Sequence, residues 1–231
     1  TIAALTGAGN VTLNSYTLTL GNASGTYSGV MSGTGGLTVS GGSQTLSGAN
    51  TYTGATTVSG GTLSLGANDV IADSSALTVS GGTFAVGTYS DTVGAVSLSS
   101  GSITGTTGVL TGSSYSVSNA TGTTTISAIL GGSGDLTKTG AGTVVLSNNN
   151  TYTGATTISA GTLSVTGSLS DSTAVSVASG ATYNVGASDT IAALTGAGNV
   201  TLNSYTLTLG NASGTYSGVM SGTGGLTVSG G

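Results

Sequence analysis

A short pattern recurs along this chain at a spacing of about 20 residues, which is in the range of solenoid repeats. An aliphatic residue is followed by serine and a glycine-containing turn at four nearly evenly spaced positions, Val39, Val58, Val79 and Leu98. We call these four positions the sequence marks. Around each mark apolar and hydroxyl residues alternate, as in the segment 77–79, Leu-Thr-Val. Such alternation predicts short strands with one face turned inward and the other outward.

A coil of about 20 residues holds two or three such strands but cannot bury its own aliphatic face. Stacking each coil on the next produces a continuous apolar core and pairs the backbone amides along the stack. Glycine provides the positive φ angles of sharp corners, and the chain lacks proline, which would remove a donor from a central strand. The sequence therefore predicts an all-β chain, a parallel β-solenoid (β-helix) forming a single elongated rod.

Longer repeats are superimposed on this period. Residues 1–42 recur without a change at 190–231, which defines a tandem unit, 1–189, whose second copy begins at 190. Within the unit, 46–65 resembles 146–165, and we define half-units with homologous segments 33–98 and 132–194. We expect one continuous solenoid segment over 1–231, either a window of a longer tandem array or a deliberately tiled sequence.

Composition narrows the possible functions. Glycine (44), threonine (45) and serine (37) make up more than half of the 231 residues, whereas only seven residues are charged, and His, Cys, Arg, Glu, Pro and Trp are absent. Most catalytic mechanisms and metal cages need side chains of these missing types, and binding to nucleic acid needs several cations. We therefore expect no enzyme, no catalytic, cofactor-binding or metal site, no cofactor, and no nucleic-acid partner.

The same composition also suits a flexible linker, but linkers lack the 36% hydrophobic residues present here. No apolar run approaches the roughly 18 residues of a membrane span, so we expect no membrane insertion in this segment. The first ten residues carry no signal-peptide pattern either. We expect an ordered chain.

The segment 134–165, GDLTKTGAGTVVLSNNNTYTGATTISAGTLSV, closely resembles the autotransporter-associated β-strand repeat. A degenerate copy at 33–65 lacks the Lys-Thr-Gly-Ala-Gly part. The resemblance implies a right-handed parallel β-helix in the passenger domain of a Gram-negative autotransporter or adhesin-like surface protein. It also implies export across the outer membrane, a signal peptide and a translocator barrel in the parent protein, and no catalytic residues.

The aspartates are the first candidate ligands. The spacing from Asp73 to Asp91 equals that from Asp171 to Asp189 and is close to one coil, so stacked carboxylates could share a calcium ion. The chain lacks the dense Gly-Gly-x-Gly-x-Asp arrays of calcium-binding solenoids. We favour carboxylates that bond the backbone of their own turns.

The other candidate side chains also have structural interpretations. Tyr52 and Tyr152 sit in repeated Asn-Thr-Tyr-Thr-Gly segments, and we expect them to cap corners or stack on the next coil rather than bind sugars. The asparagines at 148–150 suit a hydrogen-bonding turn or ladder. Lys138, the only cation, is expected at an exposed corner near Asp135.

Paired threonines raise the hypothesis of ice binding. Thr-x-Thr occurs at 17/19, 51/53, 137/139, 151/153 and 206/208, which follows the half-unit and full-unit periods rather than every coil. An ice-binding solenoid is therefore a minor alternative.

The main hypothesis is a structural segment of a long bacterial cell-surface or extracellular fibre or adhesin, acting as a rigid, protease-resistant stalk. The alternative is an adhesive module that binds itself, host glycans or other cells through a Thr/Asn/Tyr face. A further alternative is a head-to-tail filament of separate subunits, because a cut solenoid end exposes an unpaired rung.

Overall fold

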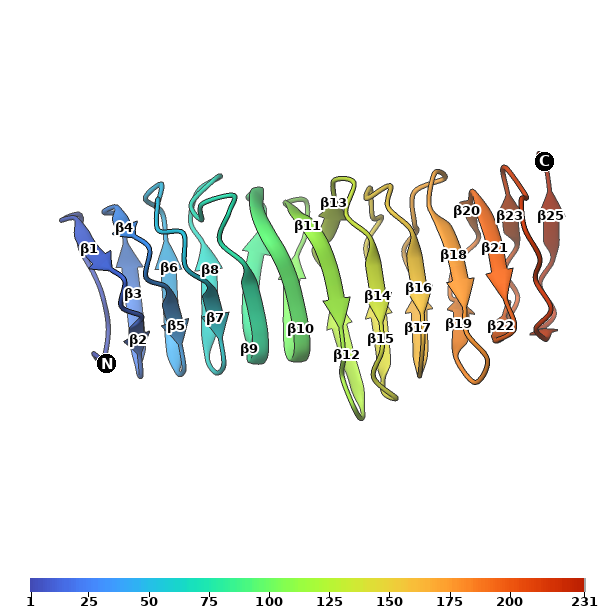
Figure 1. The fold of residues 1–231 in the computed structure, drawn as a ribbon, viewed down its shortest axis with the longest axis horizontal. Coiled ribbons are helices and arrows are strands. Elements are labelled where there is room, and N and C mark those ends of the chain that lie inside the picture. The colour runs from blue at the N-terminus through green and yellow to red at the C-terminus, as the bar shows by residue number, and fades with distance from the viewer. Residues whose placement is uncertain (231) are drawn as a thin grey trace. The chain divides into compact units, whose positions relative to one another are not determined.

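The computed structural model describes residues 1–230, and its contacts divide the chain into two compact units, Thr1–Ser113 and the part that starts at Ser114. Both units consist of β-strands, turns and bends; the described residues include no helix, and hence none that could span a membrane. The successive coils can be followed by colour in Figure 1.

The first unit stacks its strands in two main ladders. Ladder A contains β2 (Leu18–Leu20), β5 (Leu37–Val39) and β7 (Thr56–Val58), and it continues into β9 (Leu77–Gly87) and β10 (Asp91–Gly105). Ladder B contains β3 (Ala23–Tyr27), β6 (Gly42–Leu46) and β8 (Thr62–Leu65), followed by the second halves of β9 and β10. A third, shorter pair joins β1 (Val11–Asn14) to β4 (Met31–Gly33).

The second unit repeats this arrangement after β11 (Val109–Val117), the strand that includes the boundary between the units. Its ladder A contains the end of β11 and then β14 (Leu136–Lys138), β16 (Thr156–Ile158), β18 (Ala174–Val177) and β21 (Ala193–Gly196). Its ladder B contains β12 (Thr123–Ile126), β15 (Thr143–Leu146), β17 (Thr162–Val165), β19 (Thr182–Val185), β22 (Asn199–Thr201) and β24 (Met220–Ser221).

Another ladder of the second unit contains β20 (Asp189–Ile191), β23 (Leu207–Leu209) and β25 (Leu226–Val228). The remaining strand, β13 (Ile129–Gly131), precedes the turn that leads into β14.

The pairing is parallel throughout these ladders, and the register confirms the predicted period. Val39 pairs with Val58, Val58 with Val79, and Val79 with Leu98, so the four sequence marks stack on one another from coil to coil. The step is not constant along the chain, since it is shorter between Thr182 and Asn199 and longer between Tyr115 and Leu136. Each unit is therefore a parallel β-solenoid.

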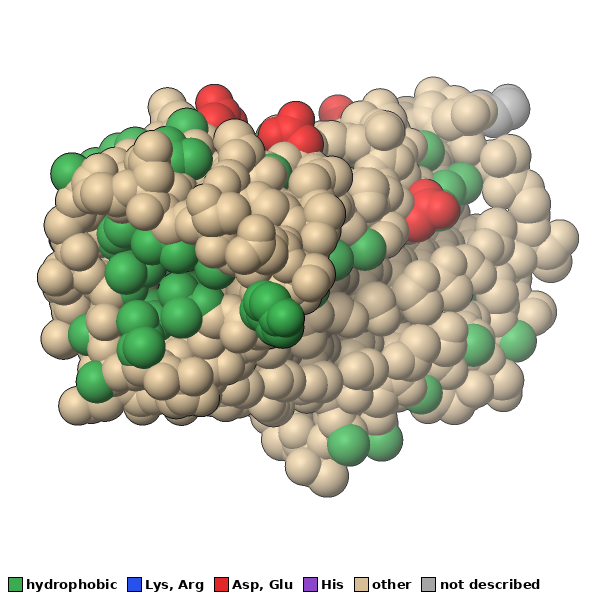
Figure 2. All heavy atoms as spheres, turned by 60° about the vertical axis from the view of Figure 1, so that its left-hand side comes forward, with side chains coloured by type: hydrophobic (Ala, Val, Ile, Leu, Met, Phe, Trp, Pro, Cys, Tyr) green, Lys and Arg blue, Asp and Glu red, His purple; other side chains and the backbone are tan. Residues whose placement is uncertain are grey.

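The core lies inside the coils. The inward positions of the strands form aliphatic rows such as Leu20, Val39, Val58 and Val79, all fully buried, while the intervening positions carry Thr and Ser. In Figure 2 hydrophobic side chains gather within the nearest coil, whereas the visible flank is mostly tan with a few red carboxylates. The outward half of each strand thus gives the surface its hydroxyl character.

Two copies of one sequence show that burial depends on the neighbouring coil. Leu37 is fully buried beneath Thr56 of the next coil, whereas Leu226, its equivalent in the identical repeated segment, is 45% exposed. Leu226 lies in β25, which pairs with the preceding β23. An isolated coil cannot bury its apolar face, so stacking supplies the stability.

Close backbone approach explains part of the glycine content. A methyl group added at Gly35 would lie 1.9 Å from the carbonyl oxygen of Tyr16, one coil earlier. At Gly42 the backbone has a φ of 74°, and an added methyl group would lie 2.1 Å from the carbonyl oxygen of Ala23. Only glycine fits such corners without displacing the coil below.

Candidate functional site

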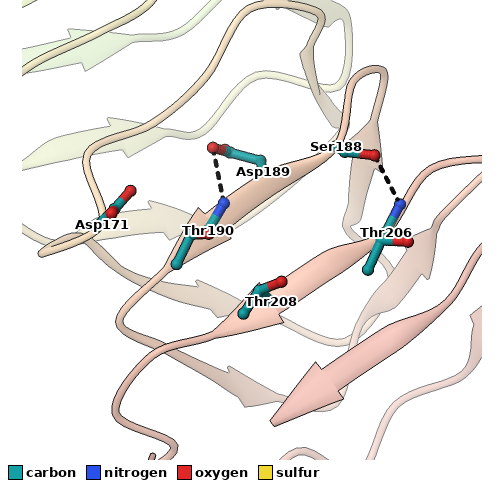
Figure 3. Close-up of a pocket in the computed structure, with 6 residues that line it drawn as sticks. All are labelled: Asp171, Ser188, Asp189, Thr190, Thr206 and Thr208. Atoms are coloured by element: carbon teal, nitrogen blue, oxygen red, sulfur yellow. Dashed lines mark hydrogen bonds between the residues drawn. The ribbon is translucent and has the colours of Figure 1, made fainter. Parts of the chain in front are cut away.

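A shallow polar depression of about 340 Å³ lies on the second unit. Its lining comes from two neighbouring strands, β20 and β23, from the residues just before them and from the turn before β18. It consists of Asp171, Ser188, Asp189, Thr190, Thr206 and Thr208. Figure 3 shows two bonds that fix this lining: the Thr190 amide donates to Asp189 Oδ1 at 3.0 Å, and the Thr206 amide donates to Ser188 Oγ at 3.1 Å. Hydroxyl and carboxyl groups dominate, and no aromatic ring contributes to the lining.

Asp189 uses both carboxylate oxygens for backbone contacts. Its Oδ2 accepts a 2.9 Å hydrogen bond from the amide of Leu169, one coil earlier, while Oδ1 accepts the bond from Thr190. Burial raises the pKa of this carboxyl group to about 6; the two amide bonds lower the pKa, and the nearby charge of Asp171 raises it. The arrangement holds adjacent coils together and leaves Asp171 exposed beside it.

Asp91 occupies the equivalent place in the first unit and is more deeply buried, with only 2% of its surface exposed. Its Oδ2 accepts 3.1 Å bonds from the amides of Val70 and Ile71, one coil earlier. Its buried Oδ1 has no hydrogen-bond partner among the described residues. Burial raises its pKa to about 7; the amide bonds lower it, and Asp69 and Asp73 raise it.

The prediction that the aspartates bond backbone groups is therefore confirmed for Asp91 and Asp189, but the prediction that these groups belong to their own turns is incomplete. Asp91 and Asp189 do bond backbone amides, but amides of the preceding coil take part, not only those of their own turns. Asp135 also bonds across coils, accepting from the amide of Ala155 at 2.8 Å. Among residues 1–230 no three metal-ligating side chains come together.

Two asparagines continue the same corner. Asn50 accepts a 2.8 Å bond from the amide of Met31 and donates a 2.7 Å bond to the carbonyl of Val70. In the second unit Asn150 accepts from the amide of Leu130 at 3.1 Å and donates to the carbonyl of Ser168 at 3.1 Å. This confirms the predicted hydrogen-bonding role of Asn150. Because Val70 also donates to Asp91, the asparagine and the aspartate form one corner ladder.

The repeated tyrosines are internal, which confirms their structural interpretation. Tyr52 and Tyr152 are fully buried, and their hydroxyl oxygens lie 2.6 Å and 2.7 Å from the hydroxyls of Thr56 and Thr156. The ring of Tyr152 also lies against Tyr115, with 5.9 Å between ring centroids. These side chains fill the core and do not face a ligand.

The prediction of an exposed Lys138 is wrong. Lys138 is fully buried and stands in an inward row between Val117 and Ile158. Its ammonium group donates to the carbonyl oxygens of Gly140 and, at 3.2 Å, Ala160. Burial lowers its pKa. The alternation of residues 136–138 does predict a buried lysine, because residues 136 and 138 share the inward face of the strand.

The register of the strands reveals a hydroxyl surface that the Thr-x-Thr pairs alone do not predict. Along ladder B of the first unit, hydroxyl residues of β3, β6, β8, β9 and β10 form two adjacent outward rows. The rows are 24/43/62/83/102 and 26/45/64/85/104, with Ala85 as the one exception. Serine replaces threonine at several of these positions, so a search for Thr-x-Thr does not find them. The result is an uncharged hydroxyl face, which we define by these two rows.

The fold places the chain among the parallel β-solenoids, and two of its segments are similar to a known passenger repeat. Residues 40–65 and 136–165 match the passenger-associated-transport-repeat. Both segments lie within the two copies compared above, and each runs through ladders A and B.

The chain is also similar to the adhesin BmaC autotransporter of Brucella suis biovar 1 (strain 1330). The identity is 40% over 110 residues, which covers 43% of this chain and 3% of that relative. The chain thus spans a small fraction of the relative's length. Comparison with solved structures found no match.

Proposed function

We propose that this segment is a rigid, non-catalytic section of a surface-displayed passenger domain in an autotransporter adhesin. The observation that carries the proposal is the unbroken parallel pairing from coil to coil within each unit, from Leu18 to Val96 in the first and from Tyr115 to Leu194 in the second. Each inner coil is hydrogen-bonded to the coils on both sides, so bending or stretching must break many bonds together.

Several features favour a scaffold over a reaction centre. The polar groups of the corners bond to the backbone of adjacent coils, and the polar depression has carboxyl and hydroxyl groups engaged in the same way. Of the seven charged residues, Asp171 and Asp189 lie in the depression, and the Asp189 carboxylate is bonded to backbone amides. The surface offers proteases few charged or bulky side chains.

Surface display and export across the outer membrane are part of the proposal, and the similarity to an autotransporter adhesin supports them. The lack of cysteine is consistent with a chain that crosses membranes unfolded. Its partners would then be the adjacent repeats of the same chain.

Mechanical stretching tests the scaffold. If the chain is pulled from its ends in an optical trap, we expect stepwise lengthening, with a step of about 65 Å for the release of one coil. Smooth extension at low force would argue against a rigid scaffold.

The hydroxyl face supports a second candidate function, adhesion to glycans or to a neighbouring copy. Beads coated with the chain test this, together with a glycan array. A scaffold predicts no clumping and no glycan signal. If clumping occurs and is lost in the variant Thr62→Ala/Thr83→Ala, but not in Thr57→Ala/Thr78→Ala on ladder A, the hydroxyl face is an adhesive surface.

A further inference from the structure

Each unit has a chain of hydrogen bonds that runs through one corner of four successive coils. We call this chain the corner ladder, and each coil contributes one layer to it. In the first unit its layers are Met31, Asn50, Val70 and Asp91; in the second they are Leu130, Asn150, Leu169 with its neighbour Ser168, and Asp189. In both, an asparagine side chain bonds the amide of the first layer, and an aspartate side chain bonds an amide of the third. One duplicated device therefore joins four successive coils at one corner.

The asparagine and aspartate side chains both accept hydrogen bonds from backbone amides of the preceding coil. Asn50 Oδ1 accepts from a backbone amide one coil earlier at 2.8 Å, and Asp91 Oδ2 accepts from amides one coil earlier at 3.1 Å. A neutral amide is therefore sufficient to hold such a corner. What a carboxyl group adds at the fourth layer is the ability to change its charge.

The surroundings of Asp91 oppose that charge. The side chain is buried, its Oδ1 has no partner among the described residues, and no cation compensates it. The titratable groups that act on it are Asp69, Asp73 and the phenol of Tyr52. Two of these are carboxylates, so their charges disfavour a third negative charge.

Asp189 has a similar environment. Its carboxyl group interacts with Asp171 and with the phenols of Tyr152 and Tyr183, and none of these supplies positive charge. Both of its oxygens accept amide bonds, which compensate its charge better than at Asp91. We therefore expect the charge of Asp189 to destabilise its corner less than the charge of Asp91 does.

We infer that Asp91 and Asp189 are acid-tightened coil locks, which make the solenoid harder to unfold in mildly acidic than in neutral medium. Protonation removes a poorly compensated buried charge. At Asp91 the remaining carbonyl oxygen still accepts both amide bonds, and at Asp189 it keeps the bond from Leu169 of the preceding coil while the bond from Thr190 weakens. The inference does not depend on the proposed scaffold function, because it concerns the corners alone.

The direction follows from proton linkage. The pKa of Asp91 in the folded chain is about 7 and that of Asp189 about 6, both above the ordinary value of 3.8. Between these values and 3.8 the folded state holds more protons than the unfolded state, so stability rises as the pH falls through this window and is highest near its lower end. We expect each lock to lower the unfolding equilibrium constant by roughly tenfold or more between about pH 8 and about pH 5.

Urea unfolding at these two pH values tests the inference, with Asp91→Asn/Asp189→Asn as the test variant and Asp135→Asn as the matched control. The test variant keeps an acceptor and loses the titration, so its stability should depend much less on pH, while Asp135→Asn should behave like the unmodified chain. Equal pH dependence in the unmodified chain and the test variant would overturn the inference.

A second measurement covers the case in which the test variant does not fold. The carboxyl carbon resonances of Asp91 and Asp189 in the unmodified chain can be followed by NMR during a pH titration. Midpoints well above the ordinary aspartate value support the locks. Midpoints near that ordinary value for both residues contradict them.

Discussion

The phenolic oxygen of Tyr152 lies 2.7 Å from the hydroxyl oxygen of Thr156, four residues later in the chain, and both side chains are fully buried. The same pair recurs in the first unit as Tyr52 and Thr56, at 2.6 Å. The copies differ in their hydroxyl contacts: Thr56 also bonds Ser75 at 3.1 Å, and Ser75 bonds the carbonyl of Gly54. The first unit thus surrounds its tyrosine with a small hydroxyl network.

This difference predicts unequal costs for removing the two phenolic hydroxyls. Tyr152→Phe leaves the buried hydroxyl of Thr156 without its side-chain partner and should cost about 1–3 kcal/mol of unfolding free energy. Tyr52→Phe should cost less, because Thr56 retains Ser75. Urea midpoints of the two variants measure this, and a larger loss for Tyr52→Phe would contradict the network.

Lys138 and Val39 occupy equivalent inward positions in the two half-units, and only the lysine copy has the longer corner Gly-Ala-Gly at 140–142. Lys138→Met should destabilise the chain by about 1–3 kcal/mol, because two carbonyls lose a charged donor. The converse change Val39→Lys should cost about 3 kcal/mol or more, because it buries a charge at a corner that has no such loop.

Thermal or urea unfolding of these two variants provides the measurement. Leu37→Met at a neighbouring inward position serves as a control for side-chain replacement within the core. If Val39→Lys unfolds at the same urea concentration as this control, a buried lysine does not need the Gly-Ala-Gly corner found at 140–142.

Trypsin has one cleavage site after Lys or Arg in this chain, at Lys138, and that side chain is fully buried. The folded chain should therefore resist trypsin, whereas the urea-unfolded chain should give two fragments, 1–138 and 139–231. Because cleavage requires opening, its rate in the folded chain should be higher in Tyr152→Phe than in Tyr52→Phe, two variants that keep Lys138 as the only site. Rapid cutting of the native chain would show that Lys138 is accessible.

Gly35 and Gly9 form a matched pair for testing coil contact. A methyl group at Gly35 would lie 1.9 Å from the Tyr16 carbonyl oxygen, whereas one at Gly9 has no heavy atom within 4 Å. Gly35→Ala should lose about 3 kcal/mol or more, and Gly9→Ala should change stability by less than about 1 kcal/mol. Comparable urea midpoints for the two variants would contradict close stacking at this corner.

The sequence was sufficient to predict the coil, since the marks at Val39, Val58 and Val79 pair in the structure in the predicted order. It did not predict which backbone atoms the side chains reach. Asp91 bonds the amide of Val70, 21 residues earlier, and Asp189 that of Leu169, 20 residues earlier, while the step between Thr182 and Asn199 is shorter; composition does not reveal such variation of the step.

The error on Lys138 has a different cause. Charged residues are usually exposed, and that general preference outweighed the alternation of residues 136–138, which places the lysine inward. The polar depression lay beyond sequence reasoning for a further reason. Its walls combine Asp171, Asp189 and Thr208, which only the stacking of coils brings together.

The coils stack in parallel, with each marked strand paired to its counterpart one coil away. Pairs of introduced cysteines test this stacking, because the chain has no cysteine of its own. Thr38 pairs with Thr57, and Thr57 with Thr78, on the outer side of ladder A. Paired residues in neighbouring strands lie about 4.8 Å apart, within reach of a disulfide, whereas a shift of two residues gives roughly 8 Å, which is too far.

The measurement is the yield of intramolecular disulfide in Thr38→Cys/Thr57→Cys and Thr57→Cys/Thr78→Cys, compared with Thr38→Cys/Ser59→Cys, under mild oxidation of the folded chain. The stacked solenoid predicts efficient closure in the first two variants and little in the third. Closure that is equal in all three, or restricted to the third, would contradict the parallel register of the solenoid.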